Sequence, residues 1–410
     1  MKRRTLCFLL LCWVMALQAK IIVVCASCPI QSVKQAIEQA QDGDVVRIES
    51  GVYREGLLLV DKKISISGHN FPVLDGGGKD EILIIHADSV LVEGLEFRNA
   101  GRSNLKDLAA LRIRRSRHFC IRNNRIFDAY FGIYVERSAQ GCISDNQVLG
   151  KSEKEATSGN AIHAWYADSL EIVNNYLSGY RDGIYLEFVN HSQVADNLSE
   201  GNLRYGLHFM FSNDDEYGCN TFRDNGAGVA VMFSKRIFMF DNLFDHNWGT
   251  AAYGLLLKEI YDAHIAGNRF TQNTIGIFLE GATRIEYRHN LFKNNGWAIQ
   301  MTGGCLDNHF SANDFETNTL DMVVNSRVNN NTFNGNYWSE YAGYDLDRDG
   351  TGDVPHRPVK LFSYILNQSP ESIVLLRSFF IDLLNYSEKI SPVFTPQEVS
   401  DQSPLMQSVL

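Results

Sequence analysis

The sequence has no apolar run as long as the roughly 20 residues that a membrane-spanning helix needs. The run in its first residues, 6–17, is shorter than that; it follows the basic residues 2–4 and precedes Ala19, a plausible cleavage site. This order is typical of a secretory signal peptide. We therefore expect residues 1–19 to be a signal peptide and the mature chain to be exported.

Positive charge is also in deficit. The chain holds 38 Lys and Arg residues against 48 Asp and Glu residues, so its formal net charge is −10. Proteins that bind nucleic acids carry basic patches that face the phosphate backbone, and this balance argues against such a partner.

The most regular feature of the sequence is a repeat marked by asparagine. Ten asparagines each follow an apolar residue by three positions, and six of the nine steps between them are 22 or 23 residues. The ten are Asn124, Asn146, Asn175, Asn197, Asn220, Asn242, Asn268, Asn290, Asn313 and Asn331. Helical repeats need about 33 residues or more, and this period leaves no room for a ten-residue helix. The sequence therefore predicts an all-β fold, a right-handed single-stranded parallel β-helix with one coil per repeat.

Each repeat holds short apolar stretches separated by Asn, Asp and Gly, which favour tight corners. Coils would stack about 4.8 Å apart, so that equivalent residues form columns and the corner asparagines form a hydrogen-bonded ladder. The open N-terminal end needs a cover. Ser32 begins a capping box, and apolar residues then recur at helical spacing, so residues 32–41 are predicted to be a capping helix. We expect an N-terminal strand and cap over 20–44 and the β-helix over 45–338.

Cysteine is sparse, and two of the eight residues lie in the leader. Cys25 and Cys28 form a C-x-x-C close to the mature N-terminus, which in an exported protein is a disulfide, a redox pair or a soft-metal site. Cys120 and Cys142 are 22 residues apart, so we expect them to stack in adjacent coils, either as small core residues or as a disulfide.

A second marker, a small residue followed by an aliphatic one, lies about eight residues after most of the asparagines. Counted from the small residue, positions +1 and +3 are nearly all aliphatic and are predicted to point inward, so positions +2 and +4 point outward. The outward columns gather His163, Trp165, Tyr185, Glu187, His208, Met210 and Met232 on one patch of one sheet.

Two interpretations of this patch are compatible. Imidazole and thioether groups are ligands for copper, so His163, His208, Met210 and Met232 are candidate ligands of a transient copper ion, with the pair Cys25 and Cys28 as further candidates. Aromatic residues and methionine are also enriched in protein interfaces. By that interpretation Trp165, Tyr185 and Glu187 belong to a docking surface for a partner that carries the metal.

An acidic segment follows the last coil. Asp345, Asp347, Asp349, Thr351 and Asp353 occupy positions 1, 3, 5, 7 and 9 of a calcium-loop pattern, with Gly350 at position six. His356 stands at position twelve, where a bidentate Glu is expected. We expect either a structural calcium site or an acidic turn that closes the solenoid, within a closing loop over 339–368.

The C-terminal segment changes in character. Ser369, Pro370 and Glu371 form a helix start, and a dense apolar run follows. An amphipathic helix and tail are therefore predicted over 369–410. The helix would cap the solenoid, lie on a membrane surface, or dock on a membrane partner. Because its apolar surface is wider than a cap needs, docking is expected, through Leu376, Phe379, Phe380 and Leu383.

A polysaccharide-modifying enzyme is the first rival, because many β-helix proteins are lyases, hydrolases or epimerases. Such sites need paired carboxylates, or a calcium-bound carboxylate cluster with a basic residue. The outward columns offer no Asp-Asp pair, and the sequence no Gly-His-Gly, of the polygalacturonase kind. Its nearest cluster is Arg112, Arg114, Arg115 and Arg117, which has no carboxylates nearby in sequence. No catalytic residue is expected, and a secreted carbohydrate-binding or polysaccharide-modifying protein is kept as the alternative.

Several segments resemble the NosD family, the periplasmic β-helix proteins of nitrous oxide reductase maturation. They are Gly183–Phe188, Asn197–Ser212, Asn225–Met232, Tyr253–Glu259, Tyr344–Gly350 with Asp353–Pro355, and Leu376–Phe380. The resemblance covers essentially the whole mature chain, and the 197–232 block is the most specific part.

The resemblance implies a periplasmic assembly factor without enzymatic activity. Members of the family work with an ABC transporter, formed by a permease and an ATPase, to build the copper–sulfide centre of nitrous oxide reductase. The C-terminal helix would then contact the permease and associate the protein with the membrane. The His/Met patch would be where a copper chaperone or the apo reductase docks.

Overall fold

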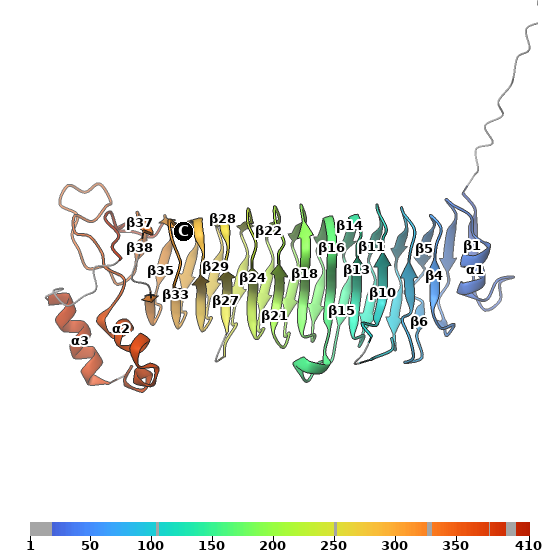
Figure 1. Ribbon diagram of the computed structural model, residues 1–410, viewed down its shortest axis with the longest axis horizontal. Helices are drawn as coiled ribbons and strands as arrows, with labels where there is room; N and C mark the ends of the chain where they lie inside the picture. Colours follow the sequence, from blue (N-terminus) through green and yellow to red (C-terminus); the bar gives the residue numbers. More distant parts are fainter. Residues whose placement is uncertain (1–18, 104–105, 250–251, 326–329, 377, 391–398) are drawn as a thin grey trace, which may run out of the picture.

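The computed structural model describes residues 19–103, 106–249, 252–325, 330–376, 378–390 and 399–410. The expected signal peptide lies outside them except for Ala19. The described chain winds into an elongated stack of coils, so the predicted parallel β-helix is confirmed (Figure 1). Each complete coil contributes one strand segment to each of three parallel sheets, which we number by their order in the coil.

Sheet 1 contains β4 (Leu58–Val60), β7 (Leu83–Ile85), β10 (Ala109–Arg114), β13 (Phe131–Glu136), β16 (Asn160–Val173), β18 (Asp182–Asn190), β21 (Tyr205–Met210), β24 (Ala227–Met232), β27 (Tyr253–Lys258), β30 (Ile275–Glu280), β33 (Trp297–Thr302) and β36 (Leu320–Asn325). Sheet 2 contains β1 (Ile21–Val24), β2 (Val45–Ile48), β5 (Ser65–Gly68), β8 (Leu91–Glu93), β11 (Cys120–Arg122), β14 (Ala139–Ser144), β19 (Gln193–Ala195), β22 (Glu216–Gly218), β25 (Phe238–Phe240), β28 (Tyr261–Ala266), β31 (Thr283–Arg288), β34 (His309–Ser311) and β37 (Thr332–Asn334). The long strand β16 runs through both sheets.

Sheet 3 contains β3 (Val52–Tyr53), β6 (Val73–Asp75), β9 (Glu96–Arg98), β12 (Arg125–Phe127), β15 (Gln147–Leu149), β17 (Tyr176–Ser178), β20 (Leu198–Glu200), β23 (Thr221–Arg223), β26 (Leu243–Asp245), β29 (Arg269–Thr271), β32 (Leu291–Lys293), β35 (Asp314–Glu316) and β38 (Tyr337–Trp338). A short 3-10 helix, Glu155–Thr157, lies in the loop before β16.

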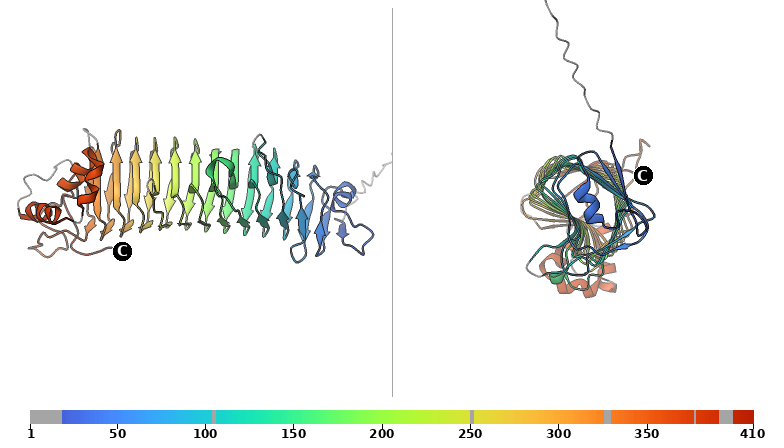
Figure 2. Two further views of the ribbon diagram at one scale, coloured as in Figure 1. Left: turned by 90° about the horizontal axis from the view of Figure 1, so that it is seen from below. Right: turned by 90° about the vertical axis from the view of Figure 1, so that its right-hand side faces the viewer.

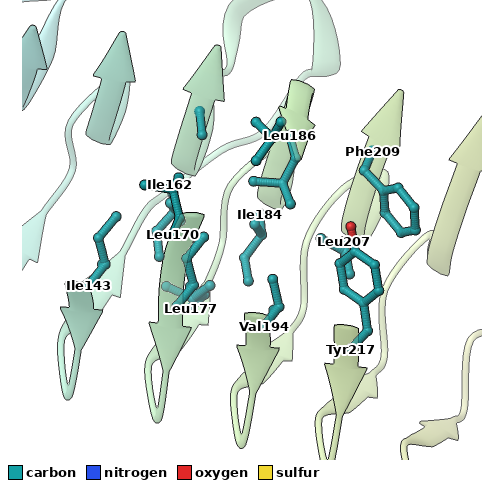
Figure 3. Packing of buried hydrophobic residues seen from close by; sticks show 14 of the residues in the cluster. Ile143, Ile162, Leu170, Leu177, Ile184, Leu186, Val194, Leu207, Phe209 and Tyr217 are labelled. Atoms are coloured by element: carbon teal, nitrogen blue, oxygen red, sulfur yellow. The ribbon is translucent and has the colours of Figure 1, made fainter. Parts of the chain in front are cut away.

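The core is a column of aliphatic and aromatic side chains inside the coils, and Figure 3 shows part of it. Residues at +1 and +3 from the small residue, such as Ile184 and Leu186, are fully buried, as predicted. The residue at the marker position is small for a steric reason. A Cβ on Gly228 would lie 2.4 Å from the carbonyl oxygen of Gly254 in the next coil. A larger residue there would push the two coils apart.

The predicted asparagine ladder is confirmed from Asn124 to Asn313. At each step a backbone N–H and a side-chain amide both donate to the next asparagine oxygen, at 2.9–3.1 Å. The assignment of Asn331 as the tenth member is wrong. The ladder continues from Asn313 to Asn336, one full coil later, whereas Asn331 accepts from Asn308 in a different column. Eighteen residues, the step to Asn331, are too few for a coil.

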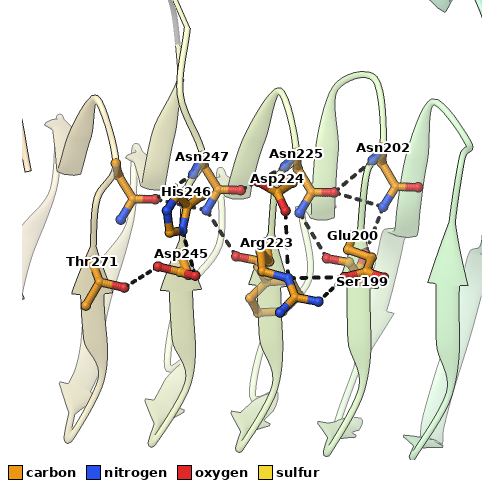
Figure 4. Close-up of polar contacts among 12 residues, drawn as sticks. Ser199, Glu200, Asn202, Arg223, Asp224, Asn225, Asp245, His246, Asn247 and Thr271 are labelled. Carbon is orange, nitrogen blue, oxygen red and sulfur yellow. Dashed lines mark hydrogen bonds and ion pairs between the residues drawn. The ribbon is translucent and has the colours of Figure 1, made fainter.

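A second asparagine ladder, which the sequence analysis missed, runs parallel to the first. Its members lie five residues after members of the first ladder, and Figure 4 shows three of them joined by hydrogen bonds. They are Asn202, Asn225, Asn247, Asn273, Asn295 and Asn318. Both ladders satisfy buried backbone groups at the corners, where coil-to-coil strand pairing is interrupted.

The N-terminal end is closed by α1 (Val33–Gln39), which lies within the outline of the coils in the end-on view of Figure 2. Ser32 is the N-cap and accepts from the backbone N–H of Gln35 at 3.1 Å. The helix is therefore slightly shorter than the predicted 32–41. A second cap comes from Glu55, whose carboxylate accepts from the backbone N–H groups of Val33 and Lys34 at 2.6 and 2.8 Å.

The C-terminal end differs from the prediction of one helix from residue 369. Three short helical segments are present instead: α2 (Leu361–Gln368), a 3-10 segment (Pro370–Leu375) and α3 (Phe379–Ile390). The predicted closing loop over 339–368 therefore ends in a helix. α2 packs against β36, and α3 lies beyond the last strands (Figure 1). In the end-on view of Figure 2 the helices lie at the edge of the coil outline rather than across its centre.

The last residues return to close the coil stack. The carboxylate of Asp401 accepts from the backbone N–H and the side-chain amide of Asn336 at 3.0 and 2.9 Å, and from the indole N–H of Trp338 at 3.1 Å. Asp401 is completely buried. It therefore terminates the first asparagine ladder, a role that the sequence analysis assigned to no residue.

Candidate functional site

The outer surface of sheet 1 from β13 to β24, which we call the outer face, carries the predicted patch. The strand register agrees with the assigned columns. One column reads Tyr134, His163, Tyr185, His208 and Ala230, and the neighbouring column reads Glu136, Trp165, Glu187, Met210 and Met232. Six of the seven predicted patch residues are partly exposed, and the seventh, His208, is buried. The arrangement follows from strand alternation, because the residues between them fill the core.

The two histidines do not converge on one point. The ring of Tyr185 lies between them, with centroid distances of 4.8 Å to His163 and 4.8 Å to His208. Two coil steps separate the imidazoles, which is roughly 10 Å. A single metal ion therefore has no common position within bonding distance of both rings.

Both histidines have an engaged ring nitrogen. The side-chain amide of Asn160 lies 2.9 Å from Nδ1 of His163, and a guanidinium nitrogen of Arg204 lies 3.0 Å from Nδ1 of His208. Both partner groups donate, so Nδ1 accepts in each ring. Burial lowers the pKa of His163 to about 3 and also lowers the pKa of His208 from its usual range. Both rings are therefore neutral near pH 7.

Met210 and Met232 are the predicted copper ligands that the structure places next to each other. They are direct register partners on β21 and β24, and both are partly exposed. The hydroxyl of Tyr185 lies 3.9 Å from the sulfur of Met210. Two adjacent thioethers at a surface form a soft donor pair, which suits a monovalent copper ion better than a hard cation.

A buried carboxylate that the sequence analysis missed organises the polar part of the outer face. Asp182 is completely buried, and its two oxygens lie 3.3 Å from Nε of Arg181 and 3.3 Å from Nε of Arg204. The residue just before the small residue of each coil also points outward, as the contacts of Asn160 and Asp182 with the histidines show. That third column would have identified Asp182 from the sequence.

The two pairs of cysteines singled out above lie away from the outer face. Cys25 and Cys28 form a disulfide, so of the three alternatives it is the disulfide that the structure contains, and in this state neither offers a thiolate to copper. Cys120 and Cys142 are register partners, as predicted, with their sulfurs 2.8 Å apart. They are partly exposed thiols rather than core residues or a disulfide. Contact with Cys120 lowers the pKa of Cys142 to about 6.

The acidic loop brings three of its five predicted calcium ligands together. Oxygen atoms of Asp345, Asp347 and Asp349 all lie within 4.8 Å of one another. The carboxylate of Asp345 also accepts from the backbone N–H groups of Arg348 and Gly350, at 2.6 and 3.0 Å. Mutual repulsion with Asp349 raises the pKa of Asp347. The remaining two residues, Thr351 and Asp353, belong to the same loop, and calcium binding stays a prediction.

His356, at position twelve of the calcium pattern, has a packing role. Its ring lies 5.1 Å from the ring of Trp338, and its backbone pairs with Asp401. Burial lowers the pKa of His356 to about 4. A neutral, packed imidazole here fixes the closing residues against the last coil.

The C-terminal helices present an apolar surface. Phe379 is 81% exposed, Phe380 59% and Leu383 53%, and the neighbouring Val374 is 85% exposed. Leu376, the fourth residue predicted to dock, instead packs against the cluster around Leu320, beside β36. Within the described residues, no helix is long and apolar enough to cross a membrane.

Comparison with known proteins gives a consistent relationship along the chain. Residues 145–343 match the family described as periplasmic copper-binding protein (NosD), and residues 26–177 match the right-handed beta helix region. A Pseudomonas aeruginosa protein named "Probable ABC transporter binding protein NosD" is 31% identical over 86% of this chain and 86% of its own length. A protein of the same name from Stutzerimonas stutzeri is 27% identical over 88% of this chain and 86% of its own length.

Similar solved structures reflect the fold alone. The catalytic unit of a GH87 alpha-1,3-glucanase from Streptomyces thermodiastaticus has a TM-score of 0.57 at 14% identity, covering 73% of this chain and 66% of that one. The Dettilon tailspike protein has a TM-score of 0.55 at 12% identity, covering 78% of this chain and 67% of that one. At these identities the likeness shows a shared β-helix and gives no information about the chemistry of the site.

Proposed function

This chain belongs to the NosD family, and from that premise we propose that it is a periplasmic accessory protein without enzymatic activity that helps to assemble the copper–sulfide centre of nitrous oxide reductase. It would act with an ABC transporter, formed by a permease and an ATPase, and copper would be its cargo rather than a resident cofactor. The observation that carries this proposal is likeness over most of the chain to proteins named as ABC transporter binding proteins.

The outer face supports a role in handling copper or in receiving a copper carrier. Met210 and Met232 offer adjacent thioethers, with the hydroxyl of Tyr185 near the sulfur of Met210 and with Glu187 and Lys258 as their outer register partners. A soft, weakly hydrated donor pair of this kind would hold a monovalent copper ion briefly and release it. A copper chaperone and the apo reductase are the partners we propose for this face, with Trp165, Tyr185 and Glu187 among its contacts.

The C-terminal helices support membrane association through the permease. Phe379, Phe380 and Leu383 are exposed on α3, close to the end of the solenoid. Exposed apolar surface of this kind marks protein or membrane contacts. We propose that it docks on the permease and so holds the solenoid at the periplasmic side of the transporter.

Two carboxylates of the outer face, Glu136 and Asp182, are poorly suited to a polysaccharide-cleaving role. Glu136 pairs with Arg112 at 3.3 Å, and Asp182 lies between two arginines. A carboxylate held by a cation is a poor general acid, because the cation favours its ionised form. The alternative is a carbohydrate-binding or polysaccharide-modifying protein, which should bind or cleave uronate polymers in a calcium-supplemented glycan screen. A screen without binding or cleavage would exclude this alternative.

A gene deletion tests the proposal in the cell. The deletion strain should make and export nitrous oxide reductase that cannot reduce nitrous oxide, and a plasmid copy of the gene should restore activity. Full activity in the deletion strain would refute the proposal.

A further inference from the structure

A groove along the corner between sheets 1 and 2 has a composition that the proposed function does not use. A cavity of about 570 Å³ opens there. Residues of four successive coils line it, among them Arg115, Arg117, Arg137, Tyr166 and Phe188. We infer that this groove binds an extended acidic segment of a partner protein, with carboxylates over the arginines and apolar side chains along the aromatic rings.

The first observation is an aromatic ladder that continues the groove along the solenoid. Tyr166, Phe188, Phe211 and Phe233 occupy the corner position in four successive coils, with centroid distances of 4.6, 5.0 and 5.1 Å and interplanar angles of 18°, 8° and 12°. Tyr166 is 49% exposed, Phe211 38% and Phe233 41%. Large apolar rings thus line up on the surface rather than in the core.

The corner conformation is shared by many coils, whereas the aromatic side chains are not. All four aromatic residues have φ between 50° and 55°, and so do Arg115, Arg137 and Glu259 at the equivalent corners of other coils. The backbone therefore does not require an aromatic residue at this position. Stacked rings stabilise one another, but partly exposed aromatic surface is also typical of contact sites.

The second observation is a group of guanidinium groups without carboxylate partners at the other end of the groove. Arg115, Arg117 and Arg137 are exposed, and in the described part of the chain none of their side chains forms an ion pair, although Arg137 lies over the ring of Trp165. Arginines elsewhere on the surface, such as Arg236 and Arg284, pair with aspartates. Unpaired positive charge in a chain of net charge −10 points to an anionic ligand.

The carboxylate that lines the groove does not cancel this charge. Asp168 lies 3.0 Å from Nδ1 of His191 and accepts from the hydroxyl of Ser169 at 2.7 Å. The contact with Asp168 raises the pKa of the His191 imidazole. Three guanidinium groups and one carboxylate line the groove, so the sum of their charges stays positive.

Ring orientation favours a peptide over a sugar polymer. Sugars pack on the open faces of aromatic rings, but the faces of Phe188 and Phe211 are covered by their neighbours in the stack. The ring edges face outward instead, and an aromatic edge carries partial positive charge that favours carbonyl and carboxylate oxygens. The ring edges therefore favour the same oxygen atoms as the arginines do, and the rings can also contact apolar side chains.

The combined length of the cavity and the aromatic ladder sets the length of the bound segment. Arg115 and Phe233 follow register-paired residues that are five coil steps apart. At a coil spacing of about 4.8 Å this span is roughly 24 Å, or about seven residues of an extended chain.

The test uses the mature protein and fluorescein-labelled peptides. The acidic probe is Glu-Glu-Glu-Ser-Phe-Ser-Phe, used also in reversed order, and a control peptide has Lys in place of Glu. Fluorescence anisotropy should show binding of at least one acidic peptide and not of the Lys peptide. The triple variant R115S/R117S/R137S should weaken this binding by about tenfold or more, as should the ring variant F211S/F233S. The control R284S, which removes an exposed arginine that pairs with Asp262 outside the groove, should bind as the wild type does.

Several outcomes would overturn the inference. They are failure of both acidic peptides to bind, equal binding by the triple variant, and binding of an oligouronate in place of the peptides. Thermal midpoints of the variants close to that of the wild type, expected because all substituted side chains are exposed, separate loss of binding from loss of folding. The inference does not depend on the role in reductase assembly, since the binding assay contains no copper and no transporter.

Discussion

A guanidinium nitrogen of Arg204 donates to Nδ1 of His208 at 3.0 Å. Guanidinium can only donate, so the lone pair of Nδ1 is occupied and the imidazole proton lies on Nε2. Within the described residues Nε2 is buried and has no hydrogen-bond partner. Neither ring nitrogen of His208 is therefore a ready ligand for a metal ion, which shifts the copper hypothesis onto the thioethers.

Removing the two thioethers should remove copper binding by the outer face. The double variant Met210→Leu/Met232→Leu keeps the side-chain volume but loses both sulfur donors, so its affinity for Cu(I) should fall on the order of tenfold or more. His208→Ala should leave the affinity nearly unchanged. Competition with a colorimetric Cu(I) chelator measures both effects.

The matched control is Met239→Leu, because Met239 is buried in the core and cannot reach the surface. Unchanged copper affinity in the double variant, or an equal loss in the Met239 variant, would remove the outer face as a copper site.

A buried carboxyl should make stability depend on pH. Burial raises the pKa of Asp215 to about 8, whereas an unfolded chain has the ordinary value of 3.8. The folded state therefore retains a proton that the unfolded state releases. The resulting stability is fully present below about pH 4 and is lost as the pH rises toward 8, a loss on the order of a few kcal/mol.

Asp215→Asn removes this dependence. The amide keeps the acceptor for the backbone N–H of Ser192, as Asn308 does for Ile285 in the same column. Urea unfolding at several pH values should give a variant that is more stable than the wild type at pH 8 and similar at pH 4. The exposed control Asp196→Asn should keep the wild-type pH dependence. A parallel pH dependence in wild type and Asp215→Asn would contradict the assignment.

Calcium should stabilise the closing loop if the acidic pattern is a site. Millimolar calcium should raise the thermal midpoint of the wild type by about 1–3 °C, and magnesium should have less effect. Asp347→Asn/Asp349→Asn should abolish the calcium effect, and the exposed control Asp61→Asn, near the opposite end, should retain it. Equal midpoints with and without calcium in the wild type would leave the loop as an acidic turn.

The exposed side chains of α3 should matter for partner binding and not for stability. Phe379→Ser/Phe380→Ser/Leu383→Ser should reduce co-purification with the permease on the order of tenfold, because buried aromatic anchors dominate the energy of interfaces. Its thermal midpoint should stay close to the wild-type value. The control variant is Val52→Ser/Leu59→Ser, which replaces exposed apolar side chains near the other end of the solenoid in the same way. Undiminished co-purification of the α3 variant would place the permease contact elsewhere.

The fold could be predicted because each turn of a coil requires the same residue types, and these recur in the sequence at the coil period. An asparagine that bonds the next coil, and a small residue where coils approach, recur wherever a coil turns, as Asn197 and Gly206 do. The same recurrence places Met210 beside Met232. Asn331 was assigned to the ladder wrongly because an apolar residue three positions earlier does not by itself identify a ladder member. The asparagine must also lie one full coil after the previous member of the ladder.

The polar contacts of the site could not be predicted from columns alone. Register gives neighbours, but it does not show that Tyr185 separates His163 from His208, or that Arg204 turns toward an imidazole rather than toward solvent. The hydrogen bond between Asn336 and Asp401 likewise joins residues 65 apart, and no repeat in the sequence indicates it.

The copper content of nitrous oxide reductase tests the account most directly. The reductase would be purified from the deletion strain and from the strain with the gene restored, and copper per polypeptide would be measured on both samples. The restored strain should yield reductase with the full copper complement, and the deletion strain should yield reductase lacking the copper of its copper–sulfide centre. Equal copper content in the two samples would contradict it.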